Sequence, residues 1–135
     1  MSERALSNRV MKILKPLDAV RIENMCGKGT PDVNYIGGWI ELKQQDKWPK
    51  RATTKVRLDH DLTLEQRIWL ERRAERGGTT WVLLQVQRDY LLFTGPVAAQ
   101  VIGHTTREEL CDAAYRVWTN VEFKRDLLAC LQQAN

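Results

Sequence analysis

Residues 32–43 read DVNYIGGWIELK and carry the pattern of two paired strands. Two runs rich in β-branched and aromatic residues flank Gly37 and Gly38. Two glycines between such runs are typical of a two-residue β-hairpin, because these turns require positive φ. We therefore predict strands over 32–36 and 39–43. The predicted cross-strand pairs are Ile36 with Trp39, Asn34 with Glu41, and Asp32 with Lys43.

The two faces of this hairpin differ in character, because side chains alternate along a strand and directly opposed residues share a face. One face is apolar and suits a core; it holds Val33, Tyr35, Ile40 and Leu42. The other face holds Asp32, Asn34, Ile36, Trp39, Glu41 and Lys43. In this register Asp32 and Glu41 are diagonal neighbours with backbones roughly 7–8 Å apart, so their carboxylates can share one ion.

The patch of Asp32, Glu41 and Lys43 suits a divalent cation. Mg²⁺ and Mn²⁺ prefer octahedral oxygen coordination, and the backbone carbonyl of Leu42 is a further candidate ligand. A bound ion would polarise a phosphoryl oxygen and lower the pKa of water, while Lys43 would orient that water or stabilise charge on the phosphate. The alternative is a surface hairpin with an Asp32–Lys43 ion pair, worth less than about 1 kcal/mol.

The flanking sequence predicts an α/β domain. Apolar residues at helical spacing follow the N-cap candidate Ser2 and end at Pro16, and alternating residues predict a strand over 18–25. Thr63 and Gln66 form a capping box that opens a helix. The remaining predicted elements are that helix to about Arg76, strands over 81–86 and 90–93, and helices from Gly95-Pro96 onward.

Composition limits the protein class. The chain has 135 residues, is 43% hydrophobic and 28% charged, and carries a net charge of +4 with a pI near 9.1. These values fit one globular domain, exclude wholesale disorder and are compatible with nucleic-acid binding. The sequence contains no apolar run long enough for a membrane span, no signal-type stretch, and three cysteines without disulfide or zinc spacing. We expect a cytoplasmic location and no membrane association.

Several motifs occur in a fixed order along residues 1–94. They are Glu3 at the start of the first helix, Gly29-Thr30-Pro31-Asp32, Trp39-Ile40-Glu41-Leu42-Lys43, Leu64-Glu65-Gln66, Gly77-Gly78 and an apolar strand from Trp81. In this order they resemble the PD-(D/E)xK nuclease superfamily, in particular its VRR-NUC branch and the related phage and archaeal Holliday-junction resolvases. The resemblance implies a restriction-endonuclease-like αβββαβ core over 1–94, with a central mixed sheet flanked by helices. Residues 95–135 would form a helical extension packed on the same domain.

The resemblance also implies roles for individual residues. Asp32 and Glu41 would bind Mg²⁺ or Mn²⁺, with Glu3 as an additional carboxylate and Lys43 assisting the water or the phosphate. Gln66 would touch the active site or the nucleic acid. Two of these residues have simpler interpretations, because Glu3 also complements the helix dipole and Gln66 completes the capping box.

Basic residues are the candidates for contact with DNA. The connection between Lys43 and Thr63 is longer than the family usually carries, and its cations suit a phosphate backbone. Trp48 would stack on an exposed base or wedge a junction; alternatively, Trp48-Pro49 folds onto the core. The candidate DNA-binding residues are Lys28, Lys47, Trp48, Lys50, Arg51, Lys55, Arg57 and Arg73.

Two motifs have simpler interpretations than their chemistry first suggests. Gly27-Lys28-Gly29-Thr30 lacks the spacing of a phosphate-binding loop, so we expect no nucleotide cofactor. Asp59-His60-Asp61 precedes a helix start and is interpreted as loop and capping chemistry rather than a metal site.

The expected activity is that of a metal-dependent endodeoxyribonuclease. The resemblance further implies selectivity for branched DNA such as a Holliday junction, and action in repair or recombination in a bacterial or phage-infected cell. Two symmetric cuts would require a homodimer. One alternative is a sequence-specific endonuclease of restriction or homing type on the same fold. Another is a non-catalytic DNA-binding module.

Overall fold

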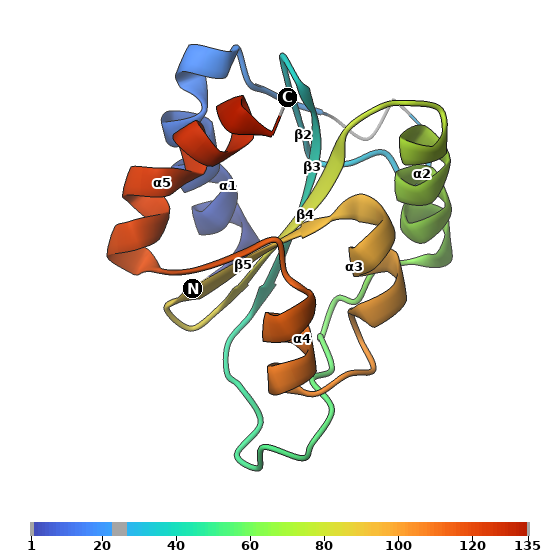
Figure 1. Ribbon diagram of the computed structural model, residues 1–135, viewed down its shortest axis with the longest axis vertical. Helices are drawn as coiled ribbons and strands as arrows, with labels where there is room; N and C mark the ends of the chain where they lie inside the picture. Colours follow the sequence, from blue (N-terminus) through green and yellow to red (C-terminus); the bar gives the residue numbers. More distant parts are fainter. Residues whose placement is uncertain (1, 23–26, 135) are drawn as a thin grey trace.

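The fold is an α/β arrangement built on one six-stranded mixed sheet, seen in a computed structural model that describes residues 2–22 and 27–134 (Figure 1). The strands follow one another across the sheet in chain order. All neighbours are antiparallel except β3 and β4, which are parallel. The strands are β1 (Val20–Arg21), β2 (Val33–Tyr35), β3 (Gly38–Gln45), β4 (Thr80–Val86), β5 (Asp89–Thr94) and β6 (Arg116–Thr119).

Helices cover both faces of the sheet. Helices α1 and α5 lie on one face, and α2, α3 and α4 lie on the other (Figure 1). The long connection between β3 and β4 contains α2, as a parallel strand pair requires. The helices are α1 (Glu3–Ile13), a short 3-10 helix (Lys15–Leu17), α2 (Leu64–Glu75), α3 (Gly95–Val101), α4 (Arg107–Ala113) and α5 (Asn120–Gln133).

Local signals correctly predicted where the first two α-helices begin. The Ser2 hydroxyl accepts a hydrogen bond from the Ala5 backbone, which confirms the predicted N-cap of α1. Thr63 and Gln66 form the predicted reciprocal capping box at the start of α2. These caps satisfy backbone N–H groups that a helix leaves unpaired in its first turn.

The core has two halves, separated by the sheet. The predicted apolar face of the β2–β3 hairpin packs against α1 and α5; it holds Val33, Tyr35, Ile40 and Leu42. The other half lies under α2, α3 and α4 and includes residues of the β3–α2 connection. Strand β4 is buried along its whole length, because helices cover it on both faces.

The predicted position of the hairpin turn is wrong by one residue. Asn34 pairs with Trp39 and Tyr35 with Gly38, so the turn residues are Ile36 and Gly37. Each residue of β2 therefore pairs with a β3 residue two positions earlier in the chain than predicted. A register shift of two residues leaves every side chain on its predicted face of the hairpin. Gly37 and Gly38 do not have the expected positive φ. Gly38 is needed for another reason, since a Cβ there would overlap the Thr79 carbonyl.

The prediction that residues 95–135 are helical is wrong for β6, which pairs with β5 at the edge of the sheet. Trp118 is buried between exposed neighbours, and this alternation is that of a strand. Four residues were too few for the period to stand out from the flanking helical pattern. The predicted strand over 18–25 is also shorter, with β1 at Val20–Arg21; its residues 23–25 lie outside the described residues.

Within residues 2–22 and 27–134, no helix combines the length and the apolar character needed to cross a membrane.

Candidate active site

Asp32 reaches the site through a loop that packs on the start of α2. Gly29 has φ of +83°, and a Cβ there would overlap the Glu65 backbone, so glycine permits this close approach. The Ile22 N–H donates to the Asp32 carbonyl at 2.8 Å, which extends the β1–β2 pairing by one step. The loop therefore holds Asp32 immediately before β2.

The Asp32 carboxylate takes the hydrogen-bonding position on β3 that a backbone partner from β2 would otherwise fill. Strand β2 pairs with β3 only as far as Ile40, and beyond that pair Asp32 Oδ2 accepts a hydrogen bond from the Leu42 N–H at 2.9 Å. The N–H and C=O of one strand residue point to the same side. The Leu42 carbonyl therefore faces the Asp32 side of β3, where the sequence predicted a ligand.

Glu41 and Lys43 extend from β3 toward α2 and are almost fully buried, with 3% and 6% of their surfaces exposed. Lys43 Nζ lies 3.6 Å from Glu41 Oε2, and it donates a hydrogen bond to the Asp61 carbonyl at 3.4 Å. Gln66 Nε2 donates to Glu41 Oε2 at 3.0 Å. Gln66 therefore contacts Glu41 and caps α2 with the same side chain; the capping interpretation is confirmed, and a role in the active site stays a prediction.

The electrostatics of Glu41 are those of a carboxyl that lacks a full counter-charge. Burial raises its pKa well above the ordinary value of 4.5, and the nearby Asp32 and Glu3 carboxylates add to that rise, while Lys43 opposes it. Glu41 Oε1 is buried without a hydrogen-bond partner among the described residues. A buried acceptor without a partner is costly, so the site is suited to a ligand that neutralises and coordinates the carboxylate.

A cavity of about 240 Å³ adjoins Asp32 where β2 parts from β3. Glu3, from the first turn of α1, lines it together with Arg4, Asp32 and Leu42. The described residues contain no group of three or more His, Cys, Asp or Glu side chains arranged to hold a metal ion. The structure thus brings Asp32 and Glu41 together and places Glu3 in the adjoining cavity, outside any such group.

Asp61 and Arg67 are site residues that the sequence did not reveal. Arg67 donates to both oxygens of the Asp61 carboxylate at 3.2 Å, and also to the carbonyls of Ala99 in α3 and of Ile102 directly after it. The Asp61 carboxylate also accepts from the Leu62 N–H, as loop chemistry predicts. Arg67 therefore holds Asp61 in place, and the Asp61 backbone carbonyl accepts the hydrogen bond from Lys43. No local sequence motif predicts this tertiary contact.

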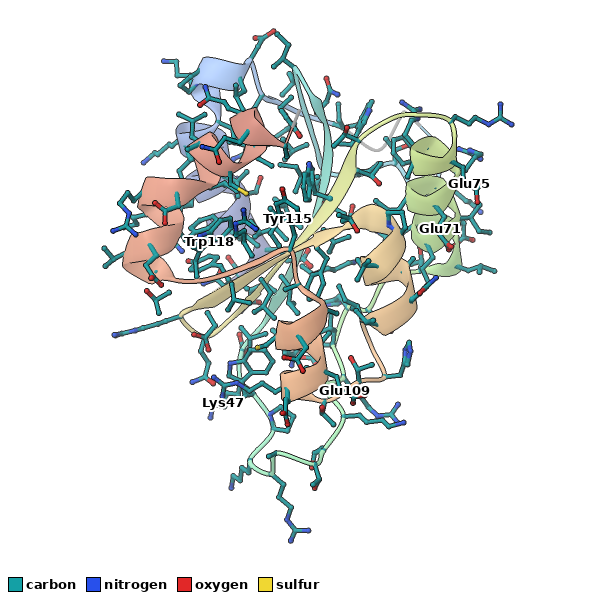
Figure 2. All side chains as sticks on the ribbon, viewed as in Figure 1. Lys47, Glu71, Glu75, Glu109, Tyr115 and Trp118 are labelled. Carbon is teal, nitrogen blue, oxygen red and sulfur yellow. The ribbon has the colours of Figure 1, made fainter. Side chains whose placement is uncertain are left out.

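The predicted DNA-binding cations lie at separate places. Most belong to the connection between β3 and α2, which extends beyond the sheet at the lower end of the molecule and includes Lys47 at its outer side (Figures 1 and 2). Val56 anchors the connection, because its side chain is buried and its N–H donates a hydrogen bond to the Thr105 carbonyl. Its exposed cations are Lys47, Lys50, Arg51, Lys55 and Arg57. Lys28 is exposed in the loop that leads to Asp32.

Trp48 is folded onto the core and is not presented to DNA. The residue is 9% exposed, its Nε1 donates to Asp89 at 2.8 Å, and the Arg107 guanidinium lies 4.5 Å from the ring centre. Of the two predicted roles, the structure therefore supports the packing role. The indole N–H finds an acceptor, which removes the cost of burying it.

Replacing Trp48 with alanine is expected to lower the free energy of unfolding by about 3 kcal/mol, because a large buried aromatic side chain is lost. Trp48→Phe should lose less, since it keeps most of the apolar surface and gives up the bond to Asp89. Urea denaturation followed by circular dichroism measures both. Equal stability of Trp48→Ala and wild type would contradict the packing role.

A cluster formed by Trp39, Trp69 and Arg73 lies on α2 and the neighbouring end of β3. The two indole rings meet edge to face with centres 5.1 Å apart. The Arg73 guanidinium lies 4.4 Å from the Trp69 ring centre and 5.4 Å from that of Trp39. Arg73 was predicted from the sequence as a DNA contact, but its packing on two tryptophan rings was not predicted.

Comparison of the chain with family models, curated proteins and solved structures found no match.

Proposed function

We propose that this protein is a Mg²⁺- or Mn²⁺-dependent endodeoxyribonuclease that hydrolyses phosphodiester bonds. The observation that carries the proposal is the buried Glu41 carboxylate, which has one oxygen without a partner beside Asp32 and lies 3.6 Å from the Lys43 ammonium. The site has two acids and one buried lysine at the point where β2 and β3 separate. Buried charges of this kind add little to stability, whereas they are well suited to bind a cation and a phosphate ester.

The residues present fit a hard divalent cation. Asp32, Glu41 and the Leu42 carbonyl would hold it, since all offer oxygen and Mg²⁺ prefers oxygen ligands while keeping several waters. When bound, such an ion polarises a phosphoryl oxygen and lowers the pKa of water. The geometry of Gln66 and Asp61 keeps Glu41 and Lys43 oriented without the ion.

Lys43 supplies a positive charge where phosphate charge develops. Its ammonium has three donors, and the Asp61 carbonyl and Glu41 Oε2 hold it in the site. It can donate to the attacking water or to a non-bridging phosphate oxygen, and the low dielectric of the site strengthens that interaction. Water adds to phosphorus and one P–O ester bond breaks, leaving a phosphate monoester and a hydroxyl.

The preferred substrate in this proposal is branched DNA, such as a four-way junction, cut by a homodimer. The support is the ordered set of motifs that resembles junction resolvases, together with the exposed cations of the long connection. A symmetric pair of cuts needs two sites related by a two-fold axis, which a homodimer supplies.

A cleavage panel tests the proposal. Purified protein is incubated with linear duplex, single-stranded, flap and four-way junction DNA, each with Mg²⁺, Mn²⁺ or EDTA. We expect cleavage that needs the cation and is fastest on the junction, and Asp32→Asn protein prepared in parallel controls for a contaminating nuclease. One fixed cut site in linear duplex would instead favour a sequence-specific endonuclease. No cleavage of any DNA, with no Mn²⁺ binding by calorimetry, would leave a non-catalytic module.

A further inference from the structure

The turn between β2 and β3 exposes an isoleucine. Ile36 is 80% exposed, the highest value among the large hydrophobic side chains that the structure describes. Turn positions favour Gly, Asn, Asp and Ser, and a β-branched residue there goes against local preference. Departures of this kind are expected at functional positions, where another requirement outweighs local stability.

The turn is held on both sides. The Ile36 N–H donates to the Leu17 carbonyl at 2.9 Å, and Asn34 Nδ2 donates to the Gly38 carbonyl at 3.1 Å. The Trp39 N–H donates to the Thr79 carbonyl at 3.0 Å. Ile36 therefore projects from a fixed support, and inserting it into a partner would cost little backbone entropy.

Ile36 and Asp32 lie at opposite ends of β2, Ile36 in the turn and Asp32 immediately before the strand. Asn34, at the middle of β2, pairs directly with Trp39, and alternation places Glu41 on the same face of the hairpin as these two residues. Asp32 and Ile36 are four residues apart, which corresponds to about 13 Å of extended chain. Stacked nucleotides of one strand rise about 3.4 Å along the axis of a duplex, so a separation of this length along that axis spans about four nucleotides.

A cationic platform lies beside this face. Arg73 stacks over Trp69 and Trp39, and Trp39 precedes Glu41 by two positions on β3. Among the described residues, Arg73 forms no ion pair with a carboxylate. A guanidinium held flat on aromatic rings keeps its edge donors available for a phosphate.

We propose that Ile36 inserts between the bases of bound DNA, about four nucleotides from the phosphodiester bond at Asp32 and Glu41, while Arg73 holds a backbone phosphate beside it. The inference rests on the proposed function and deepens it, because it identifies the side chain that selects DNA with easily separated bases. Apolar side chains that enter base steps unstack them, and this costs least at a branch or mismatch. Positive charge on Lys28 and Arg73 complements the DNA backbone.

The test uses a four-way junction carrying 2-aminopurine near the branch, four nucleotides from the cut mapped in the cleavage panel. Ca²⁺ replaces Mg²⁺, anisotropy confirms saturation, and gels confirm that the DNA is intact. We expect wild-type protein to raise 2-aminopurine fluorescence severalfold and Ile36→Ser to abolish most of that rise. Val121→Ser is the matched control, because Val121 is also strongly exposed, at 73%, but lies on α5.

Cleavage rates provide the second measurement. The ratio of junction to duplex cleavage should fall about tenfold in Ile36→Ser, as expected for one lost wedge contact, and should be unchanged in Val121→Ser. An equal fluorescence rise in Ile36→Ser, no binding by the wild type, or a smaller molecular mass of Ile36→Ser in sedimentation would overturn the proposal. The last result would make Ile36 a self-association contact. Cleavage without unstacking would overturn only the wedge, whereas absence of all cleavage would overturn the nuclease function.

Discussion

Lys43→Met protein is expected to cleave DNA at least about a hundredfold more slowly than wild type, because a positioned charge or proton donor at the reacting phosphate contributes that much. Lys43 is buried, lies 3.6 Å from Glu41 Oε2 and is held by the Asp61 carbonyl. Methionine keeps the apolar stem and removes only the ammonium. Single-turnover rates on the best substrate of the panel, at saturating Mg²⁺, measure the effect on chemistry.

Controls separate this loss from misfolding and from weaker DNA binding. Lys124→Met removes an exposed lysine of α5, far along the chain from the site, and should cleave like wild type. Circular dichroism and DNA anisotropy should show that Lys43→Met is folded and binds DNA. A folded Lys43→Met protein that cleaves within about threefold of wild type, well below the hundredfold effect of a catalytic group, would remove Lys43 from the mechanism.

The stability of the metal-free protein should fall as the pH rises above 4.5. Burial and the Asp32 carboxylate raise the pKa of Glu41 well above that ordinary value. Between the two values, the folded state holds a proton on Glu41 that the unfolded state has released. The free energy of unfolding therefore decreases through this window as the pH increases. Thermal unfolding in EDTA, measured from pH 4.5 to 8.5, follows the change.

Adding Mg²⁺ or Mn²⁺ at pH 8 should reverse that loss. An ion at a hundred times its Kd stabilises the folded state by about 2.7 kcal/mol, which corresponds to a rise in Tm of about 10 °C for a domain of this size. Glu41→Gln should lose both this rise and the pH slope. If wild type and Glu41→Gln respond identically to pH and to the ion, Glu41 is not a metal ligand.

Two exposed carboxyls that cap helices give a pH dependence of the opposite sign. Backbone and side-chain hydrogen bonds from the capping threonines Thr106 and Thr119 lower the pKa values of Glu109 and Glu122. Their contribution to stability is present above the unfolded pKa and is lost as the pH falls through their lowered values. It therefore produces the opposite slope, and only on the acid side of 4.5.

Much of the fold follows from local sequence. The capping threonines, the apolar spacing of α1 and the alternation of the β2–β3 hairpin all reflect backbone geometry within a few residues. Strand β6 was not predicted, because four residues are too few to show the alternation of side chains along a strand. Its partner β5 also lies more than 20 residues earlier in the chain.

In the β2–β3 hairpin, the sequence pattern predicts the two faces, whereas the position of the turn involves a tertiary contact. Alternation predicted its two faces correctly, since a register shift of two residues leaves them unchanged. The turn lies one residue earlier than predicted, and Gly38 permits a close approach to the Thr79 backbone, about 40 residues away in the chain. That shift places Asp32 nearer to Glu41 than the predicted register did.

Local patterns were enough to name Asp32, Glu41 and Lys43 as candidates, because strand alternation predicted that they share one face of the hairpin. The family resemblance added Gln66, which stands in a capping box. The way in which those residues are held depends on contacts between distant parts of the chain. Asp32 takes the place of a strand partner, Asp61 and Arg67 position Lys43, and Trp48 is buried while Ile36 is exposed. These contacts join residues that are distant in the chain, and packing, which depends on three-dimensional shape, selects them.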